Sequence, residues 1–173
     1  MEHILQLEDN EEFILALENY RKEYSQTKDF EIWKNYYFLL WYILAEDFPL
    51  GLQHFVVENK IWDELKIITQ EGLKHFKNIP EALFVMGYTM NIFPFLFGDY
   101  TEWENHAEEL LESLTNILPN DNIYKMVYLG SVSNGMEKEY IEICKIAAPE
   151  VKLRFSGKGL FNSYFNEVLY RIE

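Results

Sequence analysis

The chain has 173 residues, of which 49% are apolar and 17% aromatic, so it can build one packed core and is not an intrinsically disordered chain. Its 29 acidic side chains outnumber 15 Lys and Arg, and the net charge of −14 disfavours nucleic acid and anionic membranes as partners, because it repels phosphates. The same charge favours a basic partner protein, although acidity also serves solubility alone.

The start of the chain and its cysteine content predict the compartment. Residues 1–10 contain no basic region followed by an apolar run, so we expect no signal peptide. The single cysteine, Cys144, excludes an internal disulfide and fits a reducing environment. We therefore expect a cytoplasmic protein.

Apolar side chains that recur every three or four residues predict helices in the first part of the chain. Asp9 and Asn10 are candidate caps for the first helix, and Asp29 is a candidate cap for the second. The second helix contains ten uncharged residues, 36–45, which favours a buried position. We expect these helices over residues 9–25, 29–46, 51–58 and 61–76.

The stretch 80–98 is the most apolar part of the chain, and no charged side chain occurs in residues 82–98. A helix that starts at Pro80, with Glu81 near its positive end, fits the usual start signals. A membrane-spanning helix is the alternative, but it needs about 20 apolar residues. This stretch offers 17, interrupted by Thr89, Asn91 and Pro94. We therefore expect a helix up to about Gly98 that is surrounded by the other elements of a bundle.

Residues 101–118 show the clearest amphipathic pattern, with Trp103 and six aliphatic side chains on one face and glutamates on the other. We expect two further helices, over 122–132 and 136–148, with Ser133-Asn134-Gly135 between them and Pro149 ending the second. An extended piece at 151–155 and a last helix at 160–170 should complete the chain. No run of alternating strands with hairpin turns occurs. The sequence therefore predicts a single all-α domain over residues 1–173.

Two segments share a weak internal similarity. NIPEALFVMG (78–87) and DNIYKMVYLG (121–130) each combine a helix start, large apolar residues and a closing glycine. Between them, Ala107 and Pro119 resemble the small packing residue and the terminal proline of a tetratricopeptide-type hairpin. The spacing of 43 residues departs from that family's repeat of about 34. We expect antiparallel helical hairpins, stacked as a short tetratricopeptide-like solenoid or a compact bundle.

Patterns typical of catalytic or metal sites are missing. None of the four histidines follows a glutamate by three residues, and no His-Glu-x-x-His pattern occurs. Gly157-Lys158-Gly159 lacks the first glycine and the Ser or Thr of a phosphate-binding loop. We predict no catalytic residue, cofactor or metal. An enzyme whose carboxylates converge in a pocket is the least favoured alternative.

Residues 99–112 contain six acids and no Lys or Arg, with two aromatic residues among them. Such a surface can dock a basic partner, with aromatic side chains as anchors, although the solvated side of a helix looks the same in sequence. A second acidic group, Glu8, Asp9, Glu11 and Glu12, is explained by the preference for acids in a first helical turn. The candidate partner-binding residues are Glu46, Asp47, Asp99, Tyr100, Glu102, Trp103, Glu104, Glu108, Glu109 and Glu112.

The tail LRFSGKGLFNSYF, residues 153–165, resembles the C-terminal stretch of small all-α immunity proteins from bacterial toxin–immunity systems, including contact-dependent growth inhibition. The resemblance covers this segment and the acidic, aromatic-rich, helical character, and it assigns no binding residues. It implies a protein that binds a cognate toxin domain, of a basic nuclease type, and neutralises it by occlusion. The alternative is a tetratricopeptide-like adaptor that binds a peptide or partner protein; the oligomeric state stays open.

Overall fold

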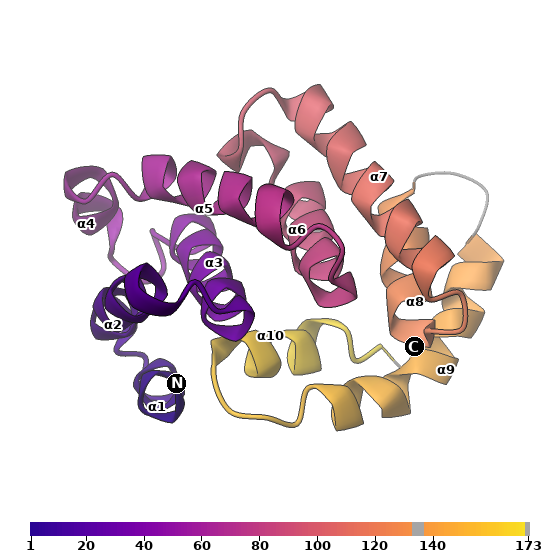
Figure 1. Cartoon of the computed structure of the whole chain (residues 1–173). Coiled ribbons are helices and arrows are strands. Elements are labelled where there is room, and N and C mark those ends of the chain that lie inside the picture. The colour runs from indigo at the N-terminus through magenta and orange to yellow at the C-terminus, as the bar shows by residue number, and fades with distance from the viewer. Residues whose placement is uncertain (133–136, 172–173) are drawn as a thin grey trace.

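The computed structural model describes residues 1–132 and 137–171, which form ten α-helices, one short 3₁₀ helix and no strand (Figure 1). The predicted all-α fold is confirmed, and the predicted Ser133-Asn134-Gly135 connection lies outside the described residues. The elements are α1 (Glu2–Asp9), α2 (Phe13–Thr27), α3 (Phe30–Ala45), α4 (Gln53–Glu58), α5 (Ile61–His75), α6 (Pro80–Ile92), η1 (Pro94–Leu96), α7 (Tyr100–Ile117), α8 (Asn122–Ser131), α9 (Glu137–Arg154) and α10 (Leu160–Val168).

Helix α3 is the centre of the first half of the chain. It packs against α2, α5, α6 and α10, and its uncharged residues 36–45 are almost all buried, as their composition predicts. Asp29 caps its N-terminus, because its carboxylate accepts the Ile32 N–H at 3.1 Å. Trp33 lies so close to α5 that a Cβ on Gly72 would stand 2.1 Å from its ring, so the two helices can only meet at a glycine.

The second half consists of two helical hairpins, α6–α7 and α8–α9, joined by packing of α7 on α8. Helix α6 is the buried central helix that residues 80–98 predict, with Ala82, Val85 and Met86 completely enclosed. Among the described residues, no helix has both the length and the apolar character needed to cross a membrane.

Helix α10 closes the bundle by contacting both halves (Figure 1). Its Phe161 and Phe165 rings pack edge-on and tilted against Phe38 of α3 at centroid distances of 5.3 and 5.2 Å, and Phe165 lies 4.8 Å from Phe84 of α6. The hairpins therefore belong to a closed arrangement, in which the last helix fills the space between the first helices and the later ones.

Two predicted helix boundaries are wrong because a local turn replaces the helix at the start of one and at the end of the other. The predicted helix over 9–25 begins only at Phe13, as α2, and Glu2–Asp9 form a separate helix, α1, that the sequence analysis does not predict. The two are separated by a turn in which Glu11 adopts a left-handed conformation, with φ of 61°. The Glu12 N–H donates to the Leu7 carbonyl and the Glu11 N–H to the Glu8 carbonyl, a pattern that ends a helix. Helix α6 ends at Ile92, not at Gly98, because Pro94 cannot continue it.

The prediction that Pro149 ends a helix is also wrong. Helix α9 runs through Pro149 to Arg154, so the expected extended piece at 151–155 is helical. Val151 and Phe155 are buried against the bundle, and this packing outweighs the loss of one hydrogen bond. Pro149 and Lys145 are both exposed, so the carbonyl that loses its donor lies on the solvent side.

Candidate functional site

Helix α7 carries most of the candidate partner-binding residues. Asp99 caps its N-terminus, because its carboxylate accepts the Glu102 N–H at 3.0 Å. Ala107, Leu111 and Leu114 are completely buried against the rest of the bundle. This packing fixes which side of α7 faces solvent, and the glutamates lie there.

No Lys or Arg among the described residues pairs with the α7 carboxylates. Glu102, Glu108, Glu109 and Glu112 are exposed and Glu104 is half-buried. Within residues 1–132 and 137–171, none of the five forms a salt bridge with Lys or Arg, and the nearest contact joins His106 Nδ1 to Glu109 Oε2 at 3.7 Å. We call these five glutamates the α7 acidic face. Its charge is not neutralised within the described part of the fold.

The two aromatic residues of the predicted site differ in their surroundings. Tyr100 is 53% exposed at the first turn of α7. Trp103 is half-buried, with its ring 5.6 Å from those of Phe97 and His106, and it leaves no room for a Cβ on Gly98. Trp103 thus forms one wall of a shallow hollow of about 380 Å³, which Glu102, Asn105, His106 and Glu109 complete.

The α7 acidic face extends around the helix from this hollow. Glu108 and Glu112 lie toward α8, where burial raises the pKa of Tyr128 and these two carboxylates raise it further. Glu102 and Glu109 lie on the side of the hollow. A partner would therefore meet carboxylates on both flanks of α7, from Glu102 to Glu112.

Glu46 and Asp47 lie elsewhere, immediately after α3 in the loop that leads to α4. Figure 1 shows α4 and α7 at opposite ends of the molecule. The structure thus brings eight of the ten candidate residues together, from Asp99 to Glu112, and separates Glu46 and Asp47 from them.

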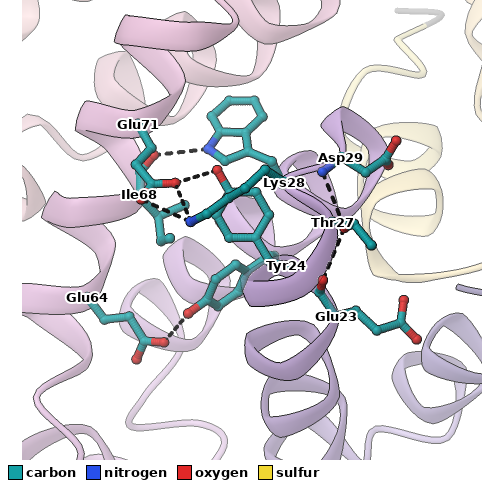
Figure 2. Close-up of polar contacts among 10 residues, drawn as sticks. Glu23, Tyr24, Thr27, Lys28, Asp29, Glu64, Ile68 and Glu71 are labelled. Atoms are coloured by element: carbon teal, nitrogen blue, oxygen red, sulfur yellow. Dashed lines mark hydrogen bonds and ion pairs between the residues drawn. The ribbon is translucent and has the colours of Figure 1, made fainter.

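A second group of carboxylates, between α2, α3 and α5, is fully paired. Glu64 accepts two hydrogen bonds from Arg21, with Nε–Oε1 at 2.7 Å and Nη2–Oε2 at 2.5 Å, and a third from the Tyr36 hydroxyl. Figure 2 shows Glu71, which accepts from the Tyr24 hydroxyl at 2.5 Å and from Lys28 at 3.0 Å. These carboxylates hold α5 against α2 and α3.

The acids near the N-terminus have a role that the sequence does not indicate. Asp9 accepts the N–H of Gly159 at 2.9 Å, and Glu8 accepts the N–H of Leu160 at 3.0 Å, so both cap α10. The prediction that they belong to the first turn of the following helix is therefore wrong. Glu8 is buried, and burial raises its pKa to about 7.

These caps also bear on the Gly157-Lys158-Gly159 turn. A phosphate at a helix N-terminus binds free backbone N–H groups. Here the N–H groups of Gly159 and Leu160 are already bound by carboxylates.

Among the described residues, no group of three His, Cys, Asp or Glu is placed to hold a metal ion, and Cys144 is buried.

A scan against protein-family models finds no matching family, and searches of curated proteins and of solved structures find no matching relative. The function must therefore be argued from the residues of this chain.

Proposed function

We propose that this protein is an immunity protein that binds a basic toxin domain in the cytoplasm and neutralises it without chemistry of its own. The observation that carries the proposal is the α7 acidic face, whose five glutamates lack Lys or Arg partners within the described residues. Carboxylates that are unpaired in the free protein are available to the cations of a partner. The resemblance of residues 153–165 to immunity proteins supports the same role.

The mechanism is occlusion after electrostatic steering. A net charge of −14 attracts a basic domain over a long distance and raises the association rate. The α7 acidic face then covers the phosphate-binding surface of a nuclease-type toxin or a neighbouring surface, with Tyr100 as an exposed aromatic contact. An interface of this kind buries about 1,600 Å² in total, and its affinity depends on a few residues.

The adaptor alternative would be favoured by a ligand-sized groove lined by Tyr and Asn. The described residues contain a cavity with this lining, which includes Tyr88, Asn91 and Tyr140, but its volume is about 90 Å³. Ligand pockets are about 300–1,000 Å³. This cavity therefore gives the adaptor no support.

The test is co-expression with the C-terminal domain of the protein encoded immediately upstream. We expect rescue of growth and co-purification as a stoichiometric complex. A non-toxic neighbour, or toxicity that this protein does not relieve, would contradict the proposal.

A charge-reversal pair tests the surface. Glu104→Lys combined with Glu108→Lys should slow association about tenfold at low salt and flatten its dependence on ionic strength. The matched control is Glu137→Lys combined with Glu142→Lys, which changes the net charge equally on the exposed side of α9. Equal association rates for the two double variants would remove the α7 acidic face from the mechanism.

A further inference from the structure

An apolar groove lies between the start of α2 and the loop from α3 to α4. Its volume is about 430 Å³, within the range of ligand-binding clefts. Two of its lining residues, Glu11 and Glu12, are acidic. Its apolar lining consists of Phe13, Ile14, Leu15, Pro49, Leu50 and Leu52.

Apolar side chains at this groove are left in contact with water. Leu15 in the lining is 47% exposed, and Phe48, next to the lining residue Pro49, is 81% exposed. Burying apolar surface of this kind is favourable. Exposed apolar side chains beside a cleft of this size are available to the apolar side chains of a partner.

Carboxylates from two separate segments lie at the groove or close to it in the chain. Glu46 and Asp47 belong to the same loop as Pro49 and Leu50. Glu46 and Glu11 both lie near the hydroxyl of Tyr42, whose pKa is raised by burial and then by these two charges. The Tyr42 ring packs 5.7 Å from that of Phe13 in the groove wall.

These charges are also uncompensated. In the part of the chain that the structure describes, none of Glu11, Glu12, Glu46 and Asp47 forms a salt bridge with Lys or Arg. An occupant must therefore combine apolar side chains with positive charge.

We propose that this groove binds an amphipathic basic segment of another protein, which inserts large apolar side chains between α2 and the α3–α4 loop and places Lys or Arg against the surrounding carboxylates. A helix with apolar residues at i and i+4 has the required form. The segment would add a second binding surface, distant from α7, and the inference holds whether or not the partner is a toxin.

The net negative charge of the protein argues against two other occupants that could cover an apolar groove, a second copy of the chain and a membrane surface. A second copy of this chain would also carry a net charge of −14, and a two-fold interface would place the same carboxylates opposite one another. An anionic membrane surface would be repelled for the same reason. A basic protein segment is the occupant that satisfies both the apolar lining and the acidic rim.

The test is fluorescence anisotropy with a labelled 14-residue helical peptide of Leu and Lys, whose Leu residues form one face. We compare the full-length protein with two groove variants. Leu15→Gln combined with Leu50→Gln keeps the net charge, and Glu11→Gln combined with Glu12→Gln keeps the apolar lining. We expect each to weaken binding at least about tenfold, which corresponds to about 1.4 kcal/mol.

The matched control is Glu104→Gln combined with Glu108→Gln, which removes the same charge from the α7 acidic face. We expect it to bind the peptide as the unmodified protein does. Equal weakening by both carboxylate pairs, or no loss with Leu15→Gln and Leu50→Gln in a variant whose circular dichroism is unchanged, would overturn the groove assignment. Failure to neutralise a toxin would not contradict peptide binding in this groove. Failure of the peptide test would not contradict the proposed role of the α7 acidic face.

Discussion

The α7 acidic face and the α2–α3–α5 contact are both rich in carboxylates, but only the second pairs them with cations. Glu64 and Glu71 accept hydrogen bonds from Arg21, Lys28 and two tyrosines, and so they join helices. The five glutamates of α7 have no such partner among the described residues. The difference indicates that a carboxylate serves the fold where a hydrogen-bond donor or cation of the fold reaches it, and is available for binding where none does.

The largest expected effect concerns Glu8, a carboxylate that accepts a backbone N–H and, among the described residues, pairs with no cation. Its pKa of about 7 lies above the ordinary value of 4.5. Below pH 4.5 the proton is bound in both the folded and the unfolded state. Between pH 4.5 and 7 the unfolded chain releases it while the folded protein keeps it. The free energy of unfolding should therefore fall as pH rises through this range, by roughly 3 kcal/mol from this group.

The measurement is urea unfolding at several pH values between 4 and 8. Glu8→Gln keeps a side-chain oxygen for the Leu160 N–H but cannot ionise. We expect it to reduce the slope and to be more stable than the unmodified protein at pH 8. An unchanged slope in Glu8→Gln would assign the pH dependence to other groups.

The second effect tests the paired carboxylates directly. Glu64→Ala removes the acceptor of Arg21 and Tyr36 and leaves both donors partly buried. We expect a loss of about 2 kcal/mol in the free energy of unfolding, measured with urea at pH 7. Glu109→Ala on α7 is the comparison, with an expected change within about 0.5 kcal/mol. Equal losses in the two variants would remove the distinction between the regions.

The third effect has the opposite sign. Glu104, Glu108 and Glu112 follow one another at i,i+4, where like charges repel. Glu108→Lys converts both repulsions into attractions and should raise the free energy of unfolding by about 0.5 to 1 kcal/mol, measured by thermal unfolding. The same change should weaken binding of the basic partner. Glu142→Lys on α9 controls for net charge, and equal stabilisation by it would point to a general charge effect.

The smallest effect is a response to salt. Raising NaCl from about 0.01 to 0.5 M screens repulsion between exposed charges and should raise the melting temperature slightly. The triple variant Glu104→Gln, Glu108→Gln, Glu112→Gln should respond less than the unmodified protein, in differential scanning calorimetry. An identical response would indicate that the repulsion is spread over the whole surface.

The features that were predicted from sequence depend on residues that are close in the chain. The cap at Asp29, the start at Pro80 and the buried run 36–45 are signals of this kind, and the structure contains them all. Pro149 does not end its helix, because packing of Val151 and Phe155 against the bundle outweighs its local preference.

The pairing of carboxylates was not accessible from sequence. Arg21 and Glu64 are 43 residues apart, and Asp9 and Gly159 are 150 residues apart. No periodicity or composition indicates that such residues meet. The apolar groove beside Glu11 and Glu12 could not be predicted for the same reason, since Leu50 and Leu52 reach it from a loop that is distant in the chain.

The caps that α1 provides for α10 also constrain the order in which the chain can fold while it is being synthesised. Glu8 and Asp9 leave the ribosome when the amides of Gly159 and Leu160 have not yet been made. Until then, the aromatic side of α3 around Phe38 lacks Phe161, Tyr164 and Phe165, which cover it in the finished fold. A nascent chain with this surface uncovered is prone to aggregate or to require a chaperone. The bundle closes only when the last helix has emerged.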